Sequence, residues 1–226
     1  MNHVILFHFI CIYSRSVRVA LHYILMGDVV ASSRHNAREL REAFMGLVST
    51  CNRDLAPDIL SPYTVTLRDE FQGVARSLGA AVKAILHFEH LTLLRGLSFK
   101  IRYVTVQDEI DTHVDRLKAH AMMGPGLTKA RAILTDKGRG TPRFRFDLPA
   151  RVVADQLNRL FLVLDGLSGR WDIDDSSLIL EMLHNRNNQE VGTRFGKDRS
   201  QIWKRRKHLL VEEYRALQTT ILEIGQ

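Results

Sequence analysis

The chain has 226 residues, of which 45% are hydrophobic and 25% are charged, a balance typical of a globular protein. With 14 Gly, 5 Pro and 2 Cys, the composition excludes collagen-like, disordered and disulfide-scaffold proteins. The formal net charge of +7 suits a nucleic-acid or acidic-membrane partner, but many proteins with neither partner carry as much charge.

Residues 1–17 contain an apolar run at positions 4–13, which is shorter than the roughly 20 residues of a membrane span. Without a basic segment before it or a clean cleavage site after it, a signal peptide is the weaker interpretation. We interpret this segment as an additional strand or as sequence upstream of the native start. Because the apolar run is too short to span a membrane, we expect no membrane partner. Cys11 and Cys51 have no partner at metal-ligand spacing, which indicates a reduced, cytoplasmic protein.

Residues 18–148 alternate between the patterns of strands and helices. Pro57 and Pro62 predict a loop ahead of the second strand. We expect strands at 21–30, 63–67, 71–74, 99–106 and 143–148, with helices at 35–52, at 78–94 and from 126 to 134. This order predicts an α+β fold, in which helices cover a ferredoxin-like sheet that contains antiparallel strands.

After residue 148 the strand signals stop. Residues 149–170 predict a connecting helix with its apolar side turned inward. We expect the remaining segment, 171–226, to form an all-α domain with helices at 176–184, at 189–195 and from 198 to about 222.

Residues 188–207 carry the pattern of a helix-turn-helix, in which a second helix packs across a first. The crossing point requires a small residue in the first helix, and Gly192 supplies one. The turn requires a residue that accepts a left-handed backbone, and Gly196 fits. Three apolar residues are expected to seal the contact between the helices: Val191, Phe195 and Ile202. Arg205 stands where the motif usually has an apolar residue, and we expect Trp203 or Leu209 to fill that space.

The segment 194–208 holds seven Lys or Arg residues and one Asp, a local net charge of +6. Such side chains neutralise phosphates and release counterions. Residues near the start of the second helix are those that meet base edges in the major groove. We therefore expect six residues of the second helix to contact DNA: Arg199, Ser200, Gln201, Lys204, Arg205 and Lys207. A basic helix that binds RNA or an acidic protein, or that has no partner, is the alternative.

Two acidic residues stand at strand ends. Asp28 ends the first strand, and Asp69 lies in the turn between the second and the third. Adjacent strand ends can bring two carboxylates to one hard cation, as a Mg²⁺ site requires. On spacing alone, the simpler interpretation is that Asp28 caps a turn and Asp69 forms a polar hairpin tip.

The segments 23–34 (YILMGDVVASSR) and 66–73 (TLRDEFQG) resemble the signature segments of the SatD family, a bacterial family named after a secretion and acid-tolerance operon. The resemblance extends to Ile101–Tyr103, to Gly124–Pro125 and to the helix-turn-helix, and it covers nearly all of residues 20–215. The N-terminal segments are also distantly similar to class III nucleotidyl cyclases and diguanylate cyclases. In those enzymes two aspartates hold the metals on a nucleoside triphosphate, which implies that role for Asp28 and Asp69.

The chain departs from the cyclase pattern where catalysis needs it. Arg68 replaces the glycine that precedes the hairpin aspartate, and Thr128 stands where the cyclase helix carries an asparagine. We therefore expect a non-catalytic site, in which Arg68 pairs with one of the two aspartates and partly replaces a metal ion. Four residues are expected to contact a nucleotide: Arg68, Gly124, Lys129 and Arg131.

These observations predict a cytoplasmic regulatory protein that binds DNA through the helix-turn-helix and senses a nucleotide in a cyclase-like domain, with Mg²⁺ as the candidate cofactor. A Mg²⁺-dependent nucleotidyl-transfer enzyme is one alternative. A protein-interaction module without DNA binding is another. Because cyclase sites often form between two subunits, analogy also predicts a homodimer.

Overall fold

The computed structural model describes residues 20–67, 69–119, 122–138 and 140–226. The N-terminal segment 1–17 and Arg68, on which two of the predictions rest, lie outside the described residues. Within the described ranges, no helix is long and apolar enough to cross a membrane.

Five strands form one mixed sheet in the order β2-β3-β1-β4-β5. The central strand β1 runs antiparallel to both β3 and β4, while β5 at the edge runs parallel to β4. The strands are β1 (Leu21–Val29), β2 (Ile59–Leu67), β3 (Glu70–Ala75), β4 (Ile101–Glu109) and β5 (Phe144–Asp147). The first four strands, with helices after β1 and β3, have the ferredoxin-like order, so the predicted α+β fold is confirmed.

Strand β2 begins four residues earlier than predicted, and Pro62 lies inside it rather than in a loop. The strand occupies an edge of the sheet, and its register with β3 shifts on both sides of Ser61. An edge strand with irregular pairing accepts a proline because the missing N–H is not required by a neighbour.

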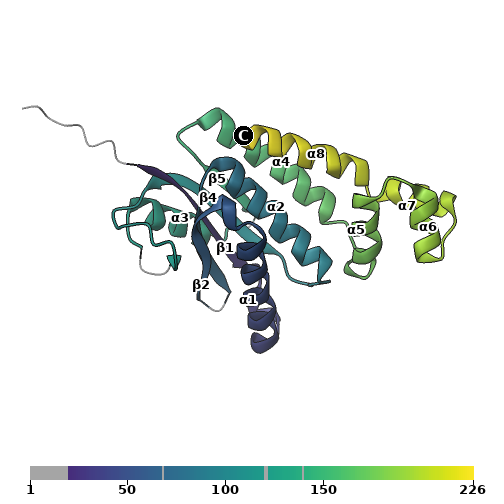
Figure 1. The fold of residues 1–226 in the computed structure, drawn as a ribbon, viewed down its shortest axis with the longest axis horizontal. Coiled ribbons are helices and arrows are strands. Elements are labelled where there is room, and N and C mark those ends of the chain that lie inside the picture. Colours follow the sequence, from purple (N-terminus) through teal and green to yellow (C-terminus); the bar gives the residue numbers. More distant parts are fainter. Residues whose placement is uncertain (1–19, 68, 120–121, 139) are drawn as a thin grey trace, which may run out of the picture.

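Helices cover both faces of the sheet, and three short helices gather at one end of the molecule, on the right of Figure 1. The helices α1, α2, α4 and α8 contribute to the large core on one face, and α3 packs on the other. The helices are α1 (Ala37–Asp54), α2 (Leu78–Leu94), α3 (Pro125–Thr135), α4 (Arg151–Ser168), α5 (Ser176–His184), α6 (Asn188–Phe195), α7 (Arg199–His208) and α8 (Val211–Gly225). One-turn 3-10 helices precede α1, β2 and α5 at Ser32–Arg34, Ala56–Asp58 and Ile173–Asp175.

The single helix predicted from residue 198 to about 222 is wrong, because the chain breaks between α7 and α8. Leu210 adopts a left-handed backbone, with φ 55° and ψ 42°. The indole N–H of Trp171 donates a hydrogen bond to the Leu209 carbonyl at 2.9 Å, which ties down the break. The turn sends α8 back along α2 and α4, where Tyr214 and Ile221 join the main core.

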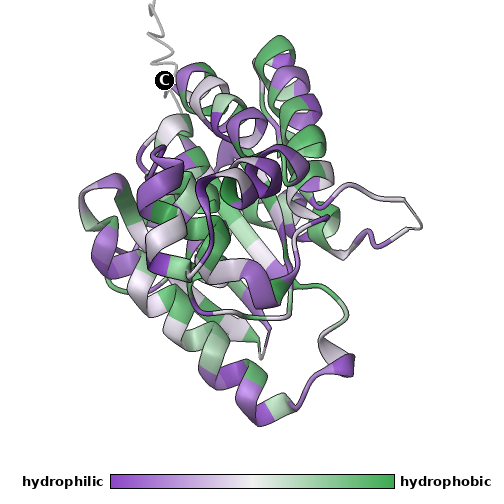
Figure 2. Cartoon of the chain, turned by 90° about the vertical axis from the view of Figure 1, so that its right-hand side faces the viewer, coloured by the Kyte–Doolittle hydropathy of each residue, from purple (hydrophilic) through white to green (hydrophobic). Residues whose placement is uncertain are grey.

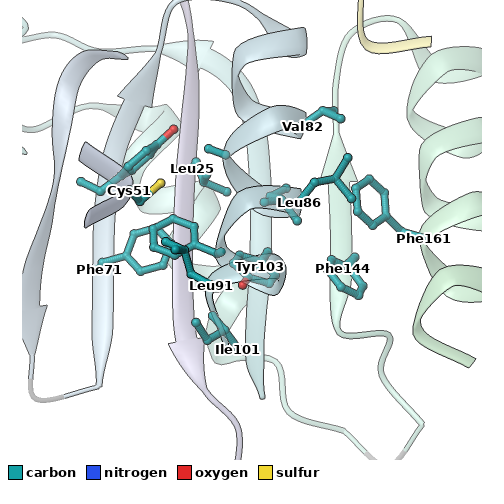
Figure 3. Close-up of a cluster of buried hydrophobic side chains, with 14 of the residues drawn as sticks. Leu25, Cys51, Phe71, Val82, Leu86, Leu91, Ile101, Tyr103, Phe144 and Phe161 are labelled. Atoms are coloured by element: carbon teal, nitrogen blue, oxygen red, sulfur yellow. The ribbon is translucent and has the colours of Figure 1, made fainter. Parts of the chain in front are cut away.

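The main core is dominated by stacked aromatic rings between the sheet and its helices (Figure 3). Phe71 on β3 stacks on Phe88 of α2 with 4.8 Å between ring centres. Phe144 on β5 lies between Tyr103 of β4, at 5.4 Å, and Phe161 of α4, at 4.8 Å. The aromatic cluster therefore spans the sheet from β3 to the β5 edge, and α4 belongs to the same core as α2.

A buried arginine holds these layers together at the start of β5. The Arg143 guanidinium donates to both Glu89 carboxylate oxygens, at 2.9 and 2.7 Å, and twice to Asp165 Oδ1, at 3.0 and 2.9 Å. Its remaining N–H donates to the Ile101 carbonyl at 2.7 Å. All five donors are thus satisfied, by α2, α4 and β4. Burial alone would lower the pKa of Arg143, but the nearby Glu89 and Asp165 carboxylates have the larger combined effect and raise that pKa.

Replacing Arg143 by Ala is expected to lower the free energy of unfolding by about 3 kcal/mol, because it leaves two carboxylates near the core without their cation. Urea denaturation followed by circular dichroism measures this change. Arg151→Ala is the matched control, since that side chain is 77% exposed, and it should change stability by less than about 0.5 kcal/mol. An Arg143→Ala protein as stable as the control would contradict the role given to the network.

Candidate functional site

Two short helices stand at the positions that the sequence predicts for a helix-turn-helix. The helices α6 and α7 are joined by residues 196–198, and Gly196 adopts a left-handed backbone with φ 63°. A Cβ atom at Gly192 would clash with the Lys197 carbonyl oxygen, so α6 packs against the turn that leads into α7 as closely as the glycine permits. Asp198 caps α7 in a capping box with Gln201.

The two helices share a small apolar core with α5 and the start of α8. Val191 and Ile202 are fully buried in it, as the sequence pattern predicts, and Phe195 packs against it half-buried. Leu209 is also buried here, whereas Trp203 is 53% exposed, so Leu209 is the one of the two that fills the expected space.

The unexpected arginine of α7 points away from this core. The Arg205 guanidinium pairs with Asp175 at the start of α5. Its neighbour Arg206 is the buried arginine, and it donates to the Met182 and Asn185 carbonyls at 2.6 and 2.7 Å and to Glu212 at 3.1 Å. Arg206 therefore fixes α7 to α5 and α8, with most of its donors bound within the protein.

The six predicted DNA-contacting residues divide into two groups. Ser200 Oγ donates to Asp198 at 2.8 Å, and Gln201 Oε1 accepts from the Asp198 N–H at 2.9 Å, so both side chains serve the cap of α7, as Arg205 serves Asp175. The other three are exposed and form no ion pair with any residue that the structure describes: Arg199, Lys204 and Lys207. These three cations lie on α7, in the group of short helices at one end of the molecule (Figure 1); Figure 2 views the chain from that side and colours it by hydropathy.

A second candidate site lies on the α3 side of the sheet, around Asp28. The side chain is buried at the end of β1, and its carboxylate binds Arg102 on β4 at 3.1 Å and Lys137 at 2.7 Å. Glu70 on β3 and Arg102 stand directly opposite Asp28 on the two neighbouring strands. The three side chains thus form one row across the centre of the sheet.

Asp69 precedes Glu70 in the turn before β3, next to this row. The Asp69 side chain lines a hollow of about 420 Å³ with Ser32, Ser33 and His35, at the start of α1. Its backbone carbonyl accepts a hydrogen bond from the Val29 N–H at 2.9 Å. The Asp28 carboxylate already binds two cationic side chains, so the surroundings of Asp28 do not fit a Mg²⁺ ion. Within the ranges described, no three Asp, Glu, His or Cys residues cluster as metal ligands, and Mg²⁺ binding by Asp28 and Asp69 stays a prediction.

The predicted nucleotide-binding residues of α3 also have partners within the protein. Lys129 binds Asp147 at 3.1 Å, and Arg131 binds Glu70 at 2.7 Å. Gly124 precedes α3 with φ 155°, and a Cβ there would meet the backbone of Asp111 at 2.7 Å. The start of α3 is therefore packed against the end of β4.

Sequence reasoning missed Arg102, Lys137 and Arg145, which gather near Asp28. Arg145 is mostly buried on β5, and two of its guanidinium nitrogens, Nε and Nη2, have no hydrogen-bond partner among the described residues. Burial and the neighbouring Arg102 lower the pKa of Arg145. The alternation within the fourth and fifth strands could have placed Arg102 and Arg145 on one face. The pairing of the fourth strand with the first, and of the fifth with the fourth, was needed to bring them near Asp28.

Burial raises the pKa of Glu70, although the cation of Arg131 acts in the opposite direction and Asp28 adds to the rise. A carboxylate with a raised pKa beside a second carboxylate is common where charge is concentrated for a function. Four cations and three carboxylates surround Asp28 on this face of the sheet: Arg102, Arg131, Lys137 and Arg145 with Asp28, Glu70 and Asp136. Lys129 pairs with Asp108 and Asp147 on the same face, so the opposite charges of these ten residues balance.

The family model described as "SatD family" matches residues 22–208. The chain belongs to the SatD family. The matched SatD segment begins in β1 and ends with the last residue of α7, so it contains both the Asp28 row and the helix pair. No curated protein matches the chain.

Replacing Gly192 by Ala is expected to lower the free energy of unfolding of this SatD-family protein by about 1–3 kcal/mol, because the added methyl group meets the Lys197 carbonyl and forces α6 and α7 apart. Gly166→Ala is the matched control. Gly166 also lies in a helix but has open space around its Cβ position, so alanine there should raise stability by up to about 1 kcal/mol. Thermal denaturation of both variants tests the prediction, and equal shifts would contradict the close approach.

Proposed function

We propose that this SatD-family protein is a cytoplasmic transcription regulator that binds double-stranded DNA with α6 and α7. The observation that carries the proposal is the exposure of Arg199, Lys204 and Lys207 on α7, unpaired with any described residue, above a close glycine-mediated crossing of the two helices. In DNA-binding proteins with this arrangement, the second helix enters the major groove and its first residues reach base edges.

Charge around α7 supports the same function. The segment 194–208 carries a local net charge of +6, whereas residues 171–226 as a whole hold nine basic and nine acidic residues. The positive charge of residues 171–226 is therefore concentrated around α7. Arg206 is buried, and Arg194 and Arg205 are paired with Glu181 and Asp175, so Arg199, Lys204 and Lys207 are the exposed cations of α7 that could bind phosphates. Ser200, Gln201 and Arg205 have partners inside the protein. We therefore expect the three exposed cations to make the main contacts with DNA.

Arg199 lies in the first turn of α7, where we expect it to read a base, and Lys207 lies in the last turn, where we expect a phosphate contact. Arg199→Ala should weaken binding to a preferred duplex by about 1–3 kcal/mol and relax the sequence preference. Lys207→Ala should weaken binding to all duplexes alike and reduce the slope of log affinity against log salt by about 1. Fluorescence anisotropy with genomic fragments at several salt concentrations measures both effects.

Arg38→Ala is the control for a general loss of positive charge, because Arg38 is an exposed arginine on α1, with 87% of its side chain accessible. It should bind as the unmodified protein does. If the unmodified protein shows no sequence-selective shift at moderate salt, the DNA-binding proposal fails and a protein-interaction module is favoured.

A second candidate function rests on the unpartnered guanidinium nitrogens of Arg145. Buried donors without acceptors are costly, and an anionic group bound beside Arg102 and Lys137 would satisfy them. We infer that this face of the sheet binds the phosphates of a nucleotide without catalysing its reaction. The cations of Arg102 and Lys137 already neutralise Asp28, so nucleotide binding should be independent of Mg²⁺.

Isothermal titration with ATP and GTP, with and without Mg²⁺, tests this inference. Arg145→Gln should weaken nucleotide binding about tenfold or more, since it removes hydrogen bonds from a charged donor. Arg151→Gln, an exposed arginine of the neighbouring helix α4, should leave binding unchanged. Mg²⁺-dependent turnover of labelled nucleotide that Asp28→Ala abolishes would instead support the nucleotidyl-transfer enzyme.

A further inference from the structure

Trp203 is the large exposed apolar side chain of α7. More than half of its surface, 53%, is accessible, although tryptophan is the side chain with most to gain from burial. The neighbouring Ile202 is fully buried, so the small core of α5, α6 and α7 is sealed without Trp203. Burial of the Trp203 ring is therefore not needed for folding of the helix pair.

The position of Trp203 within α7 places it between two exposed cations. Arg199 precedes it by four residues and Lys207 follows it by four, so the three side chains lie in one line along the helix, one turn apart. Trp203 and Arg199 also line a hollow of about 300 Å³ with Ser200 and Asn188, where the start of α6 meets the start of α7. An apolar ring between two cations is complementary to a surface on which an apolar group lies among hydrogen-bond acceptors and phosphates.

The major groove of DNA is such a surface. Phosphates line its two edges, and the C5-methyl group of thymine is the apolar feature on its floor. If Arg199 and Lys207 approach the groove as proposed, the ring between them faces the base edges. We propose that Trp203 is a specificity-determining residue that recognises a thymine by apolar contact with its methyl group. This inference rests on the proposed DNA binding and names the base that α7 reads.

The test begins with the full chain and a library of random-sequence duplexes, from which bound duplexes are selected and sequenced. In a selected duplex, each thymine is then replaced in turn by deoxyuridine, which removes only the methyl group. Loss of one buried methyl group corresponds to an affinity change of about fourfold. At one or more thymine positions, we expect deoxyuridine to weaken binding of the unmodified protein by about that factor.

Trp203→Ala should lose this sensitivity, so that thymine and deoxyuridine duplexes bind the variant equally. Trp203→Phe should keep part of it, because a smaller ring remains. Val152→Ala, which shortens an exposed apolar side chain on α4, is the matched control and should bind as the unmodified protein does. Because Trp203 is half exposed and lies outside the apolar core of the helix pair, all variants should stay folded at the temperature of the binding assay, although Trp203→Ala should melt at a lower temperature. Circular dichroism at the assay temperature separates a loss of contact from a loss of fold.

Three results would overturn the inference: deoxyuridine sensitivity that persists in Trp203→Ala, no thymine position sensitive in the unmodified protein, or a change in sedimentation of the free protein on Trp203→Ala. The last would assign the ring to a contact between two copies of the chain. Failure of the unmodified protein to enrich any duplex is a different outcome, since it refutes DNA binding itself before any variant is made.

Discussion

Arg143 is the point at which the sheet and two of its covering helices are tied to one another. Its five N–H donors reach Glu89 on α2, Asp165 on α4 and the backbone at the start of β4. A buried cation of this kind keeps its partners in place, because each carboxylate that moved away would leave charge uncompensated in a poorly solvated position. The relative placement of α2 and α4 is thereby set, and these are the helices on which α8 packs.

Arginine side chains have several different roles in this chain, and the role of each one depends on its surroundings. Arg143 and Arg206 are buried with all or most of their donors bound to the protein, so they act as structural links. Arg102 neutralises a buried aspartate, and Arg145 retains donors without acceptors. Arg199 stands in solvent beside other cations. A count of positive charge cannot separate these roles, whereas burial and partners do.

The sequence was sufficient for most elements, because their hydrophobic patterns are periodic and their ends carry clear signals. The helix at 78–94 and the glycines of the α6–α7 crossing are examples. The break at Leu210 was not predictable, since a left-handed leucine has no local signal and is held by the distant Trp171. The partners of Asp28 were missed for a similar reason. Arg102 and Lys137 are far from Asp28 in the chain: the pairing of β1 with β4 brings Arg102 to it, and Lys137 reaches it from the segment after α3.

The return of α8 to the main core determines how the α6–α7 helix pair is held in place. After α4 the chain stays in contact with that core through α5, which packs on α2, and it rejoins the core in α8, so α6 and α7 form an insertion held at both ends rather than a tail on a linker. An insertion fixed at both ends cannot tilt freely. The packing of α2, α4 and α8 therefore sets the orientation of α7. A change in the packing of those helices would reorient α7 as a rigid unit.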